Sequence, residues 1–374
     1  MRTHEKGFGL VEIMVGLAIG MLAMIVVMQV YGLSEGHKRT TTGGADAQTN
    51  GAISLSMIER DVRNSGWGMG AVQYAGCNDM HTYCDGSDAC GGTEGEITGF
   101  SLSPIVITDG GNNPDTITAQ YYADPNVGAF RLPTNTVVSD NMPSSSAELD
   151  VTTTEGCNVG DLMLAQQDGH CTLMQVTALQ GQPVKIQHNR GTNGIYNPPA
   201  SFMNANNWPQ YTIGAALTCF SAAPTGPQFK RSYSVETTLR QLLRSDNATD
   251  SSANREVISP EIVDMQAEYG VSASAGSQSV STWVAATAGS VWEHPSRANG
   301  NRIKAVRIAL LARSAQPEKP NASGVCTTTT DAMVNKWPAW AHLTASRVGS
   351  DWRCFRYKAF ETVVPLRNVL WGKV

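Results

Sequence analysis

A run of 23 apolar residues near the start of the 374-residue chain limits the folds open to it. The run, Phe8–Val30, contains a single charged residue, Glu12. As a helix it would rise about 35 Å, enough to cross the hydrocarbon core of a bilayer. Arg2 and Lys6 precede it, so the positive-inside rule predicts a cytoplasmic N-terminus and a head on the other side of the membrane.

The run does not have the pattern of a cleaved secretory signal. Such a signal has a shorter apolar core that ends in a small-x-small cleavage site. Here the core is longer, and the segment that follows, Tyr31–Arg39, offers no such site. We therefore expect the apolar helix to remain attached to the head.

Glu12 is unusual because a carboxylate inside a bilayer costs about 2.5–3.5 kcal/mol on translocon scales. As the fifth residue of the run, it can lie near the cytoplasmic interface, where the N-terminus of a helix favours negative charge. Alternatively, cleavage between Gly7 and Phe8 would create an α-amine at the same depth. That amine can pair with Glu12 of a neighbouring, axially staggered chain and relieve the cost of burying both charges.

The segment Lys6-Gly7-Phe8-Gly9-Leu10-Val11-Glu12, followed by an apolar helix, resembles the class III signal of type IV prepilins and pseudopilins. The resemblance implies that a prepilin peptidase cuts after Gly7 on the cytoplasmic face and N-methylates Phe8. It also implies that Glu12 supports assembly of the subunit.

Gly16 and Gly20 form a Gly-x-x-x-Gly pair within the apolar run. Such pairs allow transmembrane helices to approach closely. Glycine is common in membrane helices, so a packing role and a chance spacing remain equally open.

The helical pattern continues beyond the membrane segment. Thr40–Gly44 is a predicted weak point, and the helix is expected to end near Asn64, before several glycines. Its predicted apolar stripe consists of Ala52, Leu55, Ile58 and Val62.

The remaining residues predict a β-rich head. Residues 161–178 predict a hairpin with Asp168-Gly169 at its turn. Residues 237–244 fit either a strand or a helical turn. Further strands are predicted at 115–123, 230–235, 261–271, 303–313 and 353–364. Long loops are predicted at 123–149, 191–208, 245–254 and 272–300.

Four scattered segments, Met57–Gly70, Ile262–Val271, Ile303–Ser314 and Arg356–Asn368, resemble PilW, a family of large minor pilins of Gram-negative type IV pili. The resemblance implies an α+β, pilin-like fold. In this fold a long N-terminal helix, membrane-spanning in its first half, packs on an antiparallel β-sheet, and the head carries a β-rich insertion and long loops. The expected parts are a leader (1–7), the membrane and assembly half of the helix (8–30), its periplasmic half (31–64), a β-rich part of the head (65–225) and a C-terminal pilin-like sheet (226–374).

The same resemblance implies a minor pilin, not an enzyme, that primes pilus assembly and forms part of the tip complex. Its expected partners are other minor pilins, the major pilin, the prepilin peptidase, the inner-membrane assembly platform and a large tip adhesin. Before assembly it would span the inner membrane once with a periplasmic head, and after assembly it would lie at the pilus tip on the cell surface. A head of about 300 residues also fits poorly into the close axial repeat of a fibre.

Two other functions remain open from the sequence. A minor pseudopilin of type II secretion shares this design, although such proteins are usually shorter. A membrane-anchored periplasmic enzyme or receptor would share only the helix and the head.

Composition and motifs argue against other functions. The chain has 27 basic and 32 acidic residues, a net charge of -5, which disfavours nucleic-acid binding. It has none of the nucleotide-loop, zinc-protease or nucleophile-elbow motifs, so we expect no catalytic residues, no cofactor and no metal. Asp109–Asp115 is oxygen-rich but is expected to be a turn and not a calcium loop. Trp337, Trp340 and Trp352 fit core packing better than a partner-binding face.

The eight cysteines all follow the apolar run and so lie on the oxidising side of the membrane. We expect disulfides Cys326–Cys354, closing a loop before the last strand, and Cys157–Cys171, across the predicted hairpin. The order of pairing among the other four stays open. These are Cys77, Cys84, Cys90 and Cys219.

Overall fold

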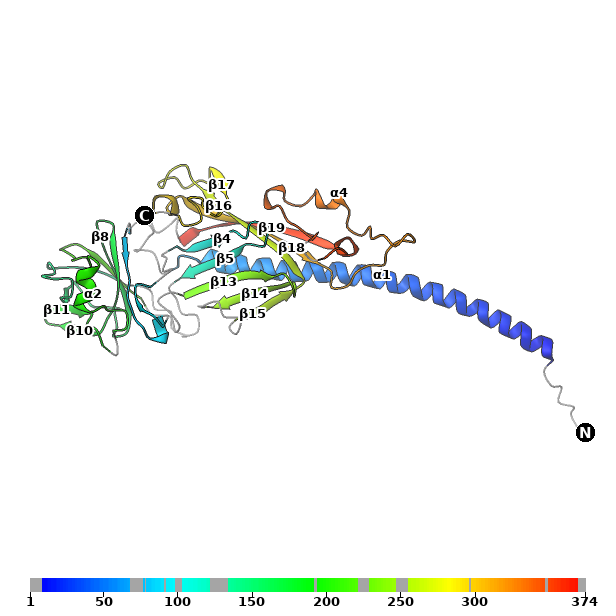
Figure 1. Cartoon of the computed structure of the whole chain (residues 1–374), viewed down its shortest axis with the longest axis horizontal. Coiled ribbons are helices and arrows are strands. Elements are labelled where there is room, and N and C mark those ends of the chain that lie inside the picture. The colour runs from blue at the N-terminus through cyan, green and yellow to red at the C-terminus, as the bar shows by residue number, and fades with distance from the viewer. Residues whose placement is uncertain are drawn as a thin grey trace, which may run out of the picture.

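The computed structural model describes residues 9–67, 77, 79–90, 92–97, 103–121, 134–191, 194–220, 229–246, 255–295, 297–346 and 349–368. One long helix, α1, precedes a head built mainly from antiparallel sheets (Figure 1). The predicted α+β, pilin-like class is therefore confirmed.

Helix α1 (Leu10–Asn64) has 55 residues and is about 80 Å long. The first proline of the sequence is Pro104, so no residue of α1 lacks the backbone N–H that a helix needs. The helix also crosses Thr40–Gly44 without a break, and the predicted weak point there is wrong. Gly43 is buried, and a Cβ added to it would lie 3.0 Å from Ser314 Cβ. Glycine at this position therefore lets the head approach the helix.

The two halves of α1 have different surroundings (Figure 1). The N-terminal half projects away from the head, whereas the C-terminal half lies along it. The most apolar 18-residue window of α1 has a mean hydropathy of 2.6, and none of it is buried. By length and composition this is a candidate membrane span.

Two sheets form the body of the head beside α1. The first has the strand order β15-β14-β13-β5-β4. Its members are β15 (Arg255–Pro260), β14 (Gln241–Asp246), β13 (Phe229–Glu236), β5 (Thr116–Tyr121) and β4 (Ile105–Thr108). The second has the order β17-β16-β18-β19. It contains β17 (Thr282–Val284), β16 (Ile262–Val271), β18 (Ile303–Arg313) and β19 (Tyr357–Pro365).

The main core lies where α1 meets these two sheets. Ile58 and Val62 of α1 are fully buried there, beside Ile117 of β5 and Ile308 of β18. Ala52 is exposed, so the predicted apolar stripe is wrong at that position. The buried face is made largely of small residues, because the sheet approaches the helix backbone closely. Its members are Gly43, Ala47, Gly51, Ser54, Ile58, Asp61 and Val62.

Most predicted strands of the body are present, with differences at their ends. Residues 237–240 form a turn in which Arg240 has a φ of 56°, and β14 starts directly after it. The strand predicted from residue 353 begins later, because a 3₁₀ turn, η5 (Trp352–Cys354), precedes β19. Three of the predicted loops contain short elements. These are β6 (Thr134–Val137) in 123–149, α2 (Ala200–Ala205) in 191–208, and β17 with α3 (Arg297–Gly300) in 272–300.

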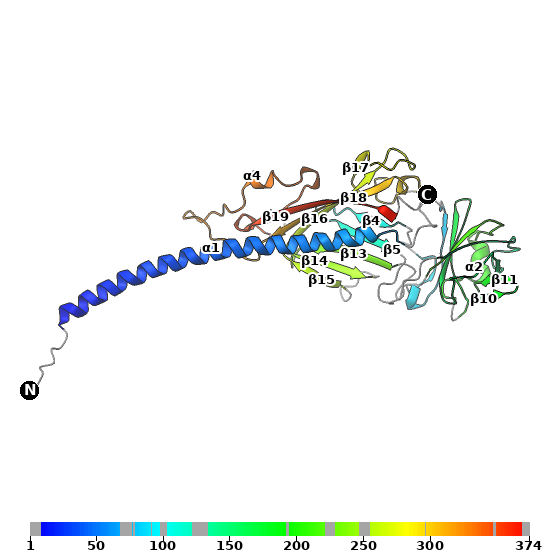
Figure 2. The same ribbon diagram turned by 180° about the vertical axis from the view of Figure 1, so that it is seen from behind.

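A second β-rich region, which we call the distal lobe, lies beyond the C-terminal end of α1 (Figures 1 and 2). Its main sheet has the order β1-β9-β8-β12-β6, with β10-β11-β7 and β2-β3 beside it. The main strands are β1 (Asp79–His81), β9 (His170–Gln175), β8 (Leu162–Gln167), β12 (Ala216–Phe220) and β6 (Thr134–Val137), the last inside a predicted loop. The smaller elements are β10 (Ala178–Gly181), β11 (Val184–Gln187), β7 (Leu149–Asp150), β2 (Cys84–Asp85), β3 (Glu94–Gly95) and η1 (Asp88–Cys90).

The predicted hairpin at residues 161–178 is confirmed as β8 and β9. Asp168 and Gly169 link the strands with φ values of 51° and 88°. Two consecutive residues with positive φ are what a type I′ turn requires, which explains the Asp-Gly pair.

Chain order and spatial order differ in the head. Strands β4 and β5 lie in sequence between β3 and β6, which both belong to the distal lobe, yet β5 pairs with β13 of the body. The body sheets therefore contain strands from both expected parts of the head, 65–225 and 226–374. After β18, the segment with α4 (Asp331–Val334) and η3 (Ala339–Ala341) packs on the outer face of β16, β18 and β19.

Candidate functional site

The first turn of α1 places Glu12 at the start of the helix. Its Oε2 accepts a hydrogen bond of 3.0 Å from the backbone N–H of Gly9. Both residues are exposed. The carboxylate therefore turns back toward the residue that follows Phe8. Gly7 and Phe8 themselves lie outside the described residues.

The apolar half of α1 is bare on all sides. Its large side chains, from Leu10 to Leu33, are more than half exposed. Apart from the adjoining residues and backbone of the helix itself, no atom of the described residues lies within 4 Å of a Cβ added to Gly16 or Gly20, so the pair packs against no other described part of the chain. Lipid or other helices must cover this surface, since water is a poor solvent for it.

Gly51 is the point of closest approach between α1 and the sheet. A Cβ built on Gly51 would lie 2.1 Å from Phe360 Cε2 of β19. No Cβ tolerates that distance, so the Phe360 ring rests directly on the helix backbone. Only glycine permits this packing without a shift of the helix or the ring.

A buried polar cluster fixes the next turns of α1 to the first sheet. Asp61 is 1% exposed, and its Oδ2 accepts a 2.5 Å hydrogen bond from the hydroxyl of Tyr233. The Arg231 guanidinium lies 3.3 Å from both oxygens of Asp61 and also pairs with Asp246. Burial, with the hydrogen bond to Asp61, raises the pKa of Tyr233, so its hydroxyl stays a donor. The negative charge of buried Asp61 is therefore compensated by the Arg231 guanidinium.

The end of α1 is capped by a residue near the other end of the sequence. The amide nitrogen of Asn368 lies 3.4, 3.3 and 3.1 Å from the carbonyl oxygens of Arg63, Asn64 and Ser65. The last carbonyls of a helix have no partner within it, so the two hydrogens of this amide help to satisfy them, and the Asn64 carbonyl also accepts from the backbone N–H of Trp67 at 3.1 Å. Asn368 thus ties the helix end to the chain that leaves β19.

A third contact holds α1 nearer its apolar half. The Thr40 hydroxyl donates to Glu318 Oε1 at 3.1 Å, and Arg356 pairs with the same carboxylate. The backbone N–H of Glu318 donates to Cys354 O at 2.8 Å. Cys354 is bonded to Cys326, the pairing expected from sequence, so a disulfide braces the segment that reaches α1.

The expected Cys157–Cys171 disulfide is wrong. Cys157 pairs with Cys219, and Cys171 pairs with Cys77. Cys157 packs in the core on one side of the distal-lobe sheet, whereas Cys171 packs on the other. Successive residues of a strand face opposite sides, so the hairpin does not by itself bring these two together.

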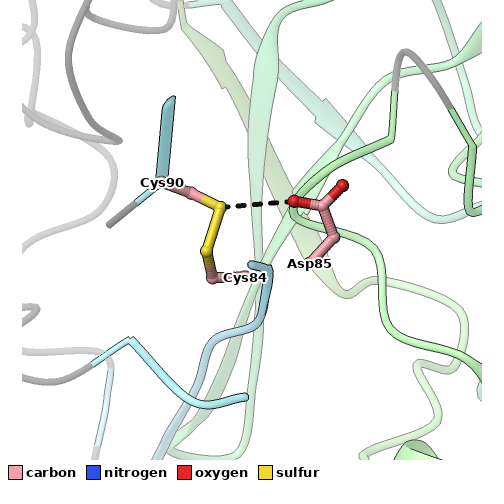
Figure 3. Close-up of side chains that lie close together, drawn as sticks. All are labelled: Cys84, Asp85 and Cys90. Atoms are coloured by element: carbon pink, nitrogen blue, oxygen red, sulfur yellow. Dashed lines mark hydrogen bonds between the residues drawn. A yellow bond between two sulfur atoms is a disulfide. The ribbon is translucent and has the colours of Figure 1, made fainter. Parts of the chain in front are cut away.

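The remaining pair, Cys84–Cys90, lies beside Asp85 (Figure 3). Two sulfurs and a carboxylate at this spacing would be typical of a metal site. Both sulfurs are used in the disulfide, and Cys90 Sγ lies 3.6 Å from Asp85 Oδ1. Without thiolates the group cannot bind a metal as cysteine ligands do.

The oxygen-rich segment at residues 109–115 is a turn, as expected. Its carboxylates accept backbone hydrogen bonds, Asp109 from Gly111 at 2.5 Å and Asp115 from Gly110 at 2.9 Å. Asp115 also accepts from Ala267 of β16 at 2.8 Å. Burial raises the pKa of Asp115 to about 7, although these N–H groups favour the charged form.

Three tryptophans of the C-terminal region pack on the outer face of the second sheet, as expected for core residues. Trp337, Trp340 and Trp352 are partly buried against a cluster that includes Leu311. Trp340 also stacks under the Arg307 guanidinium, 4.2 Å from its carbon to the ring centroid. These contacts leave the tryptophans partly covered by their own chain.

Sequence reasoning missed the residues that dock α1, notably Asp61, Tyr233, Glu318 and Asn368. One signal was available: Asp61 adjoins Val62 and follows Ile58 by three residues, so it falls on the buried face of the helix. A carboxylate on a buried helix face indicates a partner on the surface that it meets.

Comparison with known families gives two matches. Residues 230–368 match the family described as type IV pilus-assembly protein W, or PilW. Residues 2–28 match the prokaryotic N-terminal methylation motif. No curated protein and no solved structure matches the chain significantly.

Proposed function

Because this chain is a type IV prepilin-like protein of the PilW family, and so a minor pilin, we propose that it primes pilus assembly and forms part of the complex at the pilus tip. Both matched families are of structural pilus components, and we infer that the protein acts without catalysis. The observation that carries the proposal is the combination of an N-terminal methylation motif with a bare apolar helix rigidly joined to a head.

The proposed maturation is cleavage after Gly7 and N-methylation of Phe8. The match to the methylation motif includes both residues. The hydrogen bond from Gly9 to Glu12 supports a role for the carboxylate, because it holds the acid one residue from the proposed new amine. Across two staggered chains, that amine and Glu12 would neutralise each other within the membrane and set the axial register.

The proposed tip position is supported by the place of the distal lobe. The lobe lies past the C-terminal end of α1, on the side opposite the apolar half (Figures 1 and 2). In a fibre of parallel helices, that space belongs to the heads of subunits added ahead of this one. A subunit with nothing ahead of it has room for the lobe, so we assign the protein to the leading end.

The proposed partners follow from this position. The apolar half of α1 would contact the helices of the major pilin and of other minor pilins, after release from the inner membrane by the assembly platform. A large tip adhesin would be carried beyond the distal lobe. The head would be periplasmic before assembly and at the cell surface after it.

The test is analysis of fibres sheared from cells. We expect mass spectrometry to find this protein with methylated Phe8 as its first residue, and labelling to place it at fibre ends. Glu12→Gln should reduce piliation, whereas Glu35→Gln, the same change further along the helix at a half-buried glutamate that pairs with Arg39, should not. Recovery of intact Met1 from fibres, or labelling along the fibre length, would contradict the proposal.

A further inference from the structure

Two strands of the distal lobe bring three metal-binding side chains to one face. Strand β1 runs parallel to β9, with Asp79 opposite His170 and His81 opposite Thr172. Alternate residues of a strand share a face, so Asp79 and His81 lie on the same side as their partners. The Cys77–Cys171 disulfide joins the strands beside these residues and holds them in place.

Contacts made by residues 208–211 indicate the same shared face. The Tyr211 hydroxyl donates to Thr172 Oγ1 at 2.7 Å. The ring of Trp208 packs against that of His81 at an interplanar angle of 56°, with ring centroids 5.3 Å apart. Neighbouring residues of one segment therefore contact both β9 and His81 across this face.

Two of the donor atoms already have the spacing of metal ligands. His170 Nδ1 lies 3.2 Å from Asp79 Oδ2. Two ligands of a tetrahedral zinc ion, each about 2.0–2.1 Å from the metal, are separated by about 3.3 Å. The side chains of His170 and Asp79 are 51% and 62% exposed, so an ion can reach them from solution.

We propose that Asp79, His81 and His170 form a zinc-binding site on the distal lobe. Two imidazoles and one carboxylate are a donor set that zinc favours, with water in the fourth position. His81 would leave the ring of Trp208 by a change of rotamer to supply the third ligand.

The positions of the ligands explain why no sequence motif indicates this site. The ligands come from residues 79–81 and from residue 170, and only the parallel pairing of β1 with β9 joins them. The inference does not depend on the pilin role, because it concerns the lobe alone.

The test is titration of the metal-free, full-length chain in detergent with zinc sulfate, followed by calorimetry and tryptophan fluorescence. We expect one zinc per chain and a change in emission as His81 leaves Trp208. His81→Gln and His170→Gln should each weaken binding at least about tenfold, since loss of even an outer-shell partner costs 10–100-fold. His294→Gln is the matched control, because His294 is 90% exposed and lies outside the site.

The variants must first be shown to fold, by circular dichroism and by an intact Cys77–Cys171 bond in mass spectrometry. Zinc affinity that is unchanged in folded His81→Gln overturns the proposal. So does a wild-type chain that binds zinc no better than the folded His81→Gln/His170→Gln double variant.

Discussion

Addition of one methyl group at Gly51 should test whether α1 is held against the sheet by backbone contact. In Gly51→Ala the new Cβ would fall 2.1 Å from the Phe360 ring, so the ring or the helix must move. Overpacking of this kind typically costs about 1–3 kcal/mol. Alanine also favours the helix over glycine by about 1 kcal/mol, which offsets part of that cost.

Gly44→Ala provides the matched control. Gly44 lies two turns away on the same helix, and apart from the adjoining residues and backbone of that helix, no atom of the described residues comes within 4 Å of its added Cβ. Both variants gain the same helix propensity, so the difference between them isolates the clash. We expect Gly51→Ala to be less stable than Gly44→Ala by about 1–3 kcal/mol.

The free energy of unfolding would be measured by denaturant titration of the full-length chain in detergent, with tryptophan fluorescence as the signal. Phe360→Leu removes the ring and should recover part of the loss in the Gly51→Ala background. If Gly51→Ala proves as stable as Gly44→Ala, the close docking of α1 on β19 is refuted.

Two further predictions concern buried carboxylates. Asp61→Ala should lower the free energy of unfolding by about 3–5 kcal/mol, because it leaves Arg231 and Tyr233 without their buried partner. Tyr233→Phe keeps the ion pair and should lower the free energy of unfolding by only about 1–3 kcal/mol. Both variants would be measured by the same denaturant titration. Asp115 has an ordinary pKa of 3.8 that burial raises to about 7, so between these pH values the folded state keeps a proton that the unfolded state releases. The free energy of unfolding should therefore fall as pH rises from about 4 to 7, and it should fall less in Asp115→Asn. An equal decrease in the two proteins would contradict the raised pKa of Asp115.

Local patterns in the sequence were enough for the main elements. The apolar run and the absence of proline before Pro104 predict a long helix, and β18 spans the residues expected from its apolar run. The wrong predictions concern positions where tertiary contacts override the local preference of the residue. Glycines at 43 and 44 are a weak point for an isolated helix, but Gly43 is required for contact with Ser314. Propensity alone cannot distinguish a flexible glycine from one that allows close packing.

For the same reason, contacts between segments far apart in the chain could not be predicted from local sequence patterns. Cys171 was expected to bond across its own hairpin, but its partner, Cys77, lies 94 residues away in the chain. The hairpin was correctly predicted, but the sequence of a single strand does not show against which core each of its two faces packs. Asn368 at the end of α1 and Asp79 beside His170 are similar cases.

The contacts along α1 bear on how a minor pilin would position its head. Glu318 holds the helix at Thr40, Phe360 rests on Gly51, Tyr233 binds Asp61, and Asn368 caps the last turn. These contacts cover some 25 residues of helix, about 37 Å, so the head cannot swing about a single point. A stiff α1 then fixes the distance from Glu12 to the distal lobe. If Glu12 sets the axial register of the proposed subunit, the same pairing also sets the height at which the lobe projects beyond the fibre.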